Sequence, residues 1–140
     1  MTPNFTLAEL TITNHRSLDN TPDPASRANL QRLAVFLELV KDRLGGRPIM
    51  VSSAYRSAAV NAACGSRETS QHRLGCAADV RVPGMTPDAV VRAVMTSGLE
   101  YDQIIREFDR WTHLSIPNTP VSLPRKAALI IDRQGTRIYG

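Results

Sequence analysis

The chain has 140 residues, a net charge of +4 at pH 7, 42% hydrophobic and 21% charged residues. This size and composition are typical of one globular domain, so we expect a single domain over residues 1–140. No apolar run approaches the roughly 18 residues of a transmembrane helix, and the opening MTPNFTLAEL does not resemble a secretory signal. We therefore expect a protein made in the cytoplasm, without a signal peptide or a transmembrane segment.

The positive charge would suit an anionic partner such as nucleic acid or a bacterial wall. The basic residues are scattered, however, and no aromatic residues are interleaved with them, so no nucleic-acid partner is expected. The two cysteines, Cys64 and Cys76, are too few for a disulfide scaffold. We expect them to be free thiols, and a bridge between them stays open as the alternative.

The first predicted element is a short helix that starts at Thr6. Thr6 and Glu9 have the spacing of a capping box, in which each side chain bonds to the other residue's backbone N–H. Residues 11–23 are polar and rich in turn formers, which predicts a loop.

A long amphipathic helix is predicted next. Asp23 is a suitable N-cap and Pro24 suits the first helical position. Gly45-Gly46 indicates the end of the helix. Apolar residues follow at spacings of three and four, which predicts one buried stripe: Leu30, Leu33, Leu37, Val40 and Leu44.

Short elements are predicted in the middle of the chain. Residues 49–51 are apolar and predict a buried strand, and residues 57–63 predict a short helix capped by Ser57. The polar segment 65–72 predicts a loop. Residues 79–82 alternate and predict a second strand.

The rest of the chain predicts one more helix and several strands. Residues 86–98 begin with a cap followed by proline and carry an apolar stripe. Residues 102–108 and 111–117 predict two strands joined by a tight turn, and residues 127–140 predict a strand, a Gln134-Gly135 turn and a short return. This mixture predicts an α+β fold with a mostly antiparallel sheet and flanking helices.

Three residues are candidate metal ligands: His72, Asp79 and His113. A catalytic zinc ion commonly has three protein ligands of these types and a water molecule at the fourth position. The side chains can meet only if the strands that carry Asp79 and His113 are neighbours. Spacing alone leaves a second interpretation open, in which the histidines are packed side chains and the aspartate is a turn residue.

Three ordered motifs resemble a known family. Residues 70–79, SQHRLGCAAD, resemble the SxHxxGxAxD signature of zinc D-Ala-D-Ala carboxypeptidases and their relatives. Residues 52–57, SSAYRS, and 111–115, WTHLS, resemble two further segments of that family, and FTLAEL and LDNTPD resemble the start of its phage branch. The family includes vancomycin-resistance dipeptidases and phage endolysins that cut peptidoglycan stem peptides, and it shares its fold with the hedgehog signalling domain. The likeness covers about Phe5 to Ser115.

The resemblance implies roles for single residues. It implies a zinc cofactor bound by the three candidate ligands, and a hedgehog-like fold. It implies that Arg56 binds the scissile carbonyl or the oxyanion formed from it, where a guanidinium offers charge and several donors. A surface position for Arg56 is the alternative. Ser70 and Gln71 are expected to line the substrate pocket.

The general base is where the chain departs from the commoner family pattern. Relatives carry an acidic residue three positions before the final histidine, and here that position is Arg110. Glu107 and Asp109 are the nearby acids, and we expect Glu107 to be the base. If residues 109–111 form a three-residue loop, Glu107 lies opposite His113 on the same face. A two-residue turn would direct Glu107 away.

We therefore expect a monomeric zinc metallopeptidase, a carboxypeptidase or an endopeptidase, that hydrolyses an amide bond in the peptidoglycan stem peptide. The absence of a signal suits a phage or prophage lysis protein released to the wall. Two other classes stay open. One is a non-catalytic zinc-containing module that binds the wall or has a structural role. The other is a nucleic-acid partner with a structural metal.

Overall fold

The computed structural model, which describes residues 1–139, contains the predicted long helix. Helix α2 (Pro24–Arg43) begins where Asp23 accepts a hydrogen bond of 2.7 Å from the backbone N–H of Ser26. All five residues of the predicted apolar stripe are buried. Burial of this stripe, more than intrinsic propensity, stabilises a helix of this length.

The shorter helices also begin where their capping residues predict. They are α1 (Leu7–Leu10), α3 (Ala58–Ala63) and α4 (Pro87–Met95). Their N-caps are Thr6, Ser57 and Thr86, and Thr6 forms the predicted capping box. The predicted loop before the second strand contains a 3-10 helix, η1 (Gln71–Leu74), which the sequence analysis missed.

Within residues 1–139, six strands form one sheet in the order β1-β2-β4-β3-β5-β6. Their bounds are β1 (Met50–Ser53), β2 (Ala77–Arg81), β3 (Gln103–Glu107), β4 (Trp111–Ser115), β5 (Ala127–Asp132) and β6 (Gly135–Ile138). All neighbouring pairs are antiparallel except β3 and β5, which are parallel. The α+β class with a mostly antiparallel sheet is therefore confirmed.

Two strand predictions need correction. The first strand was expected to be buried, but β1 is at the edge of the sheet and the Met50 side chain is 61% exposed. The last turn was expected at Gln134-Gly135, but Asp132 pairs with Gly135, so the turn residues are Arg133 and Gln134. Gly135 has φ +101°, a backbone conformation that glycine adopts without steric cost.

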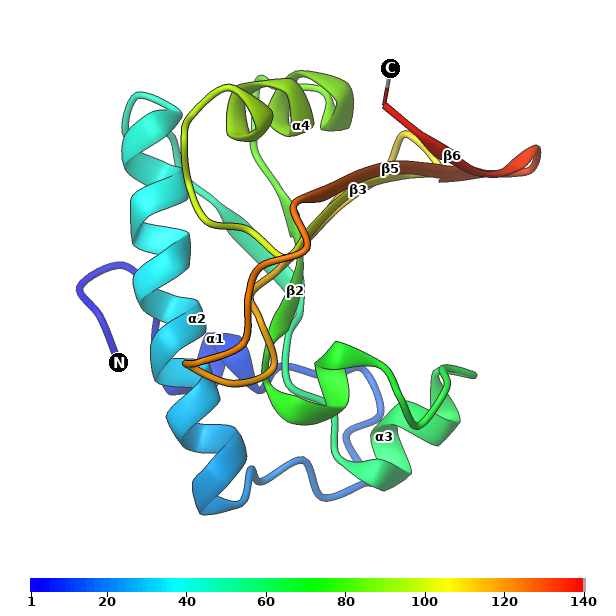
Figure 1. Cartoon of the computed structure of the whole chain (residues 1–140). Coiled ribbons are helices and arrows are strands. Elements are labelled where there is room, and N and C mark those ends of the chain that lie inside the picture. Colours follow the sequence, from blue (N-terminus) through cyan, green and yellow to red (C-terminus); the bar gives the residue numbers. More distant parts are fainter. Residues whose placement is uncertain (140) are drawn as a thin grey trace.

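The two faces of the sheet have different surroundings. Helix α2 runs along one face, and the β5–β6 hairpin extends to the other side of the molecule (Figure 1). Alternation directs Ala78, Val80 and Leu114 into the core that α2 covers. The same alternation directs Asp79 and His113 to the opposite face.

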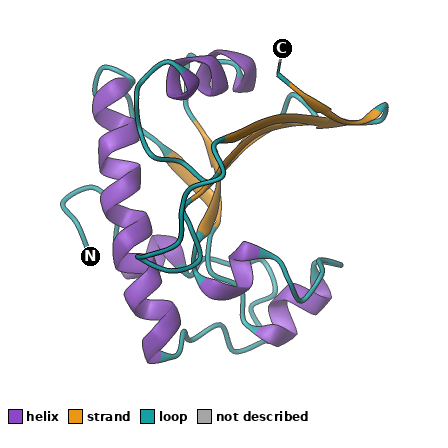
Figure 2. Ribbon diagram, in the orientation of Figure 1, coloured by secondary structure: helices purple, strands orange, loops and turns teal. Residues whose placement is uncertain are grey.

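The helices lie on the flanks of the strands (Figure 2). Among residues 1–139, none of the helices combines the length and the apolar character that a membrane crossing requires.

Candidate metal centre

The pairing of β2 with β4 brings two of the predicted ligands together. Asp79 is directly opposite His113 in the antiparallel register. Directly paired residues point to the same face of a sheet, and their side chains are close enough to interact. His113 Nδ1 lies 3.0 Å from Asp79 Oδ1.

The third ligand comes from the turn that precedes β2. His72 belongs to η1, and Gly75 ends this helix with φ +79°, so that the chain can turn directly into the strand. The Nδ1 of His72 lies 2.7 Å from the backbone carbonyl of Ala54 and donates to it, which leaves Nε2 without a proton. Nε2 points toward Asp79 Oδ1 at 3.4 Å.

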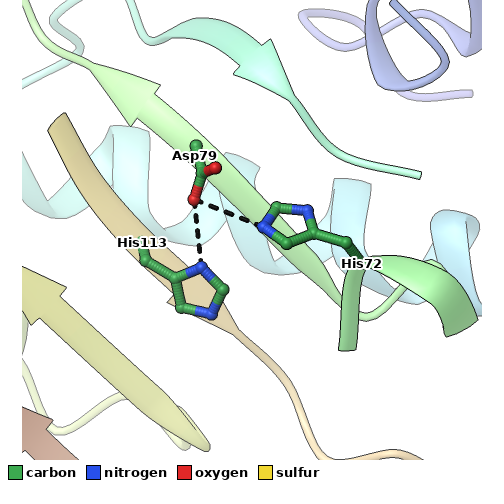
Figure 3. A group of neighbouring side chains, drawn as sticks. All are labelled: His72, Asp79 and His113. Carbon is green, nitrogen blue, oxygen red and sulfur yellow. Dashed lines mark hydrogen bonds and ion pairs between the residues drawn. The ribbon is translucent and has the colours of Figure 1, made fainter. Parts of the chain in front are cut away.

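The three side chains form one cluster on the sheet face away from α2 (Figure 3). One donor atom from each of His72, Asp79 and His113 lies within 4.8 Å of the others. Two imidazole nitrogens and a carboxylate oxygen are typical zinc ligands, and three of them leave one tetrahedral position for water. The donor set and the oriented His72 ring therefore fit a zinc ion.

The electrostatics also favour a cation at this cluster. Burial raises the pKa of Asp79, but the nearby His72 and His113 rings outweigh it and the net pKa is lowered. Burial lowers the pKa of His72, which favours its neutral form. A deprotonated carboxylate and a neutral imidazole are the forms that bind metal.

Arg56 lies at the edge of the cluster and is held by three side chains. Its Nε donates to Ser53 Oγ at 3.0 Å and its Nη1 to Ser66 Oγ at 3.0 Å. Its Nη2 lies 3.3 Å from Asp79 Oδ2, the carboxylate oxygen that does not contact the histidines. The guanidinium is thus a partly buried positive charge fixed beside the candidate ligands, and the surface alternative does not describe it.

The hairpin between β3 and β4 differs from its predicted register. Glu107 pairs with Trp111, and the loop is Phe108–Arg110, one residue earlier than expected. Ile105, not Glu107, is opposite His113. A hydrogen bond of 2.9 Å from Phe108 N to the Ile131 carbonyl of β5 extends the pairing of β3 and fixes the loop there.

The observed register differs from the predicted one by two residues, and alternate residues of a strand point to the same face. Glu107 therefore still faces the cluster. Its Oε1 lies 4.0 Å from His113 Nδ1, and its side chain is 20% exposed. Burial, with a smaller contribution from Asp79, raises the pKa of Glu107. Asp109 is 64% exposed at the hairpin tip and pairs with Arg106, outside the cluster.

Ser70 and Gln71 have different positions. Ser70 is the N-cap of η1, and its Oγ accepts a hydrogen bond of 3.3 Å from His72 N. The Gln71 amide instead donates to Asp102, to the Ile116 carbonyl and to Asn118. The structure therefore does not bring the Gln71 side chain to the three candidate ligands.

Sequence reasoning missed two kinds of contact around the site. The Ala54 carbonyl that orients His72 is a backbone atom, and its identity carries no signal in the sequence. Asp102 was assigned only to a strand. As an acid two positions before the apolar pair Ile104-Ile105, it could have been recognised as a candidate for a buried charge.

Comparisons with known proteins identify the family. The model of the family described as Peptidase M15 matches residues 3–115, which contain all the candidate site residues. No curated protein matches the chain. The match confirms the resemblance carried by the three sequence motifs. The chain belongs to the peptidase M15 family of zinc D-Ala-D-Ala carboxypeptidase-like enzymes.

Proposed function

We propose that this protein is a zinc peptidase that hydrolyses an amide bond in the peptidoglycan stem peptide. The observation that carries the proposal is the convergence of His72, Asp79 and His113 within 4.8 Å, with a carboxylate and a guanidinium beside them. A structural zinc site needs neither group. The family match to residues 3–115 supports the same reaction class.

Each protein group has a distinct part in the proposed reaction. Zinc, when bound, would lower the pKa of a water molecule and polarise the scissile carbonyl. The Glu107 carboxylate accepts the proton of that water and later delivers it to the leaving amine. Arg56 donates hydrogen bonds to the oxygen on which negative charge develops. Its bonds to Ser53 and Ser66 hold the guanidinium in place before substrate arrives.

The elevated pKa of Glu107 agrees with the role of a base. A carboxylate with a raised pKa binds a proton more readily and can carry it between water and the amine. Asp109 is solvated and paired with Arg106, so it has no comparable route to the site. These positions support Glu107 as the base.

The proposed biological setting is cell-wall lysis by a phage or prophage, with the protein acting as a monomer after release from the cytoplasm. The net charge of +4 would help it to remain on an anionic wall. The reaction products would distinguish a carboxypeptidase from an endopeptidase. Mass spectrometry of digested sacculi identifies the bond from the fragments released.

The decisive variant is Glu107→Gln, which removes the base while keeping the shape of the side chain. We expect zinc binding to be retained and hydrolysis of sacculi to fall at least 10²-fold, the lower range for general acid–base catalysis. Asp109→Asn is the matched control and should keep near-normal activity. Wild-type protein that binds zinc but releases no peptide would instead support a non-catalytic wall-binding module.

A further inference from the structure

A hydrogen-bond network around one buried carboxylate joins the C-terminal tail to the ligand-bearing turn. Its central group is the carboxylate of Asp102, the residue directly before β3, whose side chain is only 5% exposed. Asp102 Oδ2 accepts hydrogen bonds from Gln71 Nε2 at 3.0 Å and from Arg125 Nη2 at 2.6 Å. Its Oδ1 accepts from Arg125 N at 2.9 Å.

The network reaches both ligand-bearing segments through short connections. Gln71 is the residue before the ligand His72, and its amide also bonds to the Ile116 carbonyl at 2.9 Å. Asp102 N donates to the carbonyl of Ser115 on β4, the strand that carries His113. Asp102 therefore bonds to the turn before one histidine and to the strand that holds the other.

Arg125 neutralises this carboxylate from outside the family match, which ends at residue 115. Its Nε also bonds to Asp102 Oδ2 at 3.0 Å, so one guanidinium supplies two donors to one oxygen. A buried carboxylate without such a partner has a high free-energy cost. Removal of Arg125 would therefore cause Asp102 to become protonated or to be hydrated by water. Either change would weaken the hydrogen bond from the Gln71 amide to Asp102 and leave the amide with Ile116 and Asn118 as acceptors.

We propose that Asp102 and Arg125 are positioning residues for the metal centre: through Gln71 they set the place of His72 relative to His113. The inference rests on the proposed zinc site. It assigns to the tail segment a part in metal binding rather than stability alone. Partners beyond the direct ligands commonly change metal affinity by about 10–100-fold when they are removed.

The test is Arg125→Met, which removes the charge and the donors from a half-exposed side chain. Zinc affinity is measured by competition with a chromophoric chelator, and ligand geometry by the visible absorption of the cobalt(II)-substituted protein. We expect the zinc dissociation constant to rise about tenfold, the lower end of that range, and the cobalt spectrum to change. Asp102→Asn should produce the same pair of effects.

The matched control is Arg137→Met. Arg137 also lies in the tail and makes a two-pronged pair with a carboxylate, Asp132, at 2.9 and 2.7 Å. Its loss should lower the melting temperature without changing zinc affinity or the cobalt spectrum. If Arg125→Met keeps both metal readouts of the wild type, the network is only structural and the inference is wrong. Wild-type protein that fails to bind zinc would instead overturn the proposed function.

Discussion

At the scale of single residues, Arg56 is fixed in place by three different side chains. Each of its three guanidinium nitrogens has a separate partner, Ser53, Ser66 or Asp79. A lysine at this position would keep the charge but not the planar set of donors. The guanidinium is therefore held by geometry that only arginine can satisfy.

We expect Arg56→Lys to lower kcat by about 10²–10³-fold with a smaller change in KM, because an oxyanion donor acts mainly in the transition state. The measurement is steady-state hydrolysis of a synthetic stem peptide by the zinc-loaded protein. Arg73→Lys is the control, since Arg73 follows the ligand His72 but pairs with Glu68 at 3.1 Å. Unchanged turnover in Arg56→Lys would return Arg56 to a structural role.

The candidate metal ligands were predictable because short motifs carry them. The hydrogen-bond partners of these residues were less predictable from the sequence. His72, Asp79 and His113 lie together as the motifs suggested, whereas Glu107 faces them from a register two residues away from the predicted one. The Gln71 side chain does not line this cluster, because its amide donates to the buried Asp102. No local pattern in the sequence reveals a contact between positions 31 residues apart.

At the scale of elements, the turn between η1 and β2 has no space for a side chain at Gly75. Gly75 has φ +79°, and a Cβ atom there would lie 2.7 Å from the Ser26 carbonyl of α2. The backbone of the ligand-bearing turn thus contacts the first turn of the long helix. A side chain at Gly75 would strain the backbone and separate these two elements.

We expect Gly75→Ala to lower the free energy of unfolding by about 1–2 kcal/mol for the left-handed backbone, and by roughly 1–3 kcal/mol more for the contact with α2. Urea titration measures the loss. Gly65→Ala is the control, because Gly65 has φ +73° but nothing lies within 4 Å of its Cβ position. Equal losses in the two variants would show that the contact with α2 has no energetic role.

Helix starts were predicted more accurately than strand registers. A cap such as Asp23 with Pro24 is local, and its chemistry acts within four residues. The hairpin register is decided by a distant strand, because Phe108 N bonds to Ile131 of β5. The parallel pairing of β3 with β5 also requires the crossing segment 116–126, which carries no periodic pattern.

At the scale of the whole molecule, the candidate metal centre joins parts of the chain that are far apart in sequence. Its ligands come from η1, β2 and β4, and the second oxygen of Asp79 is bound by Arg56 after β1. Zinc bound only by the folded form would therefore stabilise the entire sheet. Stabilisation of this kind depends on the free metal concentration.

We expect zinc at 100 times its dissociation constant to raise the free energy of unfolding by about 2.7 kcal/mol. The measurement is the melting temperature of the chelator-treated protein before and after zinc addition. His113→Ala removes a ligand and should show no comparable rise. A wild-type melting temperature that does not respond to zinc would contradict the metal centre.

The direct pairing of Asp79 with His113 has a consequence for folding kinetics. These residues are 34 positions apart, so their strands meet by closing a long loop, which is slow compared with local helix formation. If the strands were to pair one residue out of register, one ligand would turn into the apolar core. Bound zinc would thus favour the one alignment in which both side chains share a face. A zinc ion at this site would thus discriminate against misaligned strand pairings.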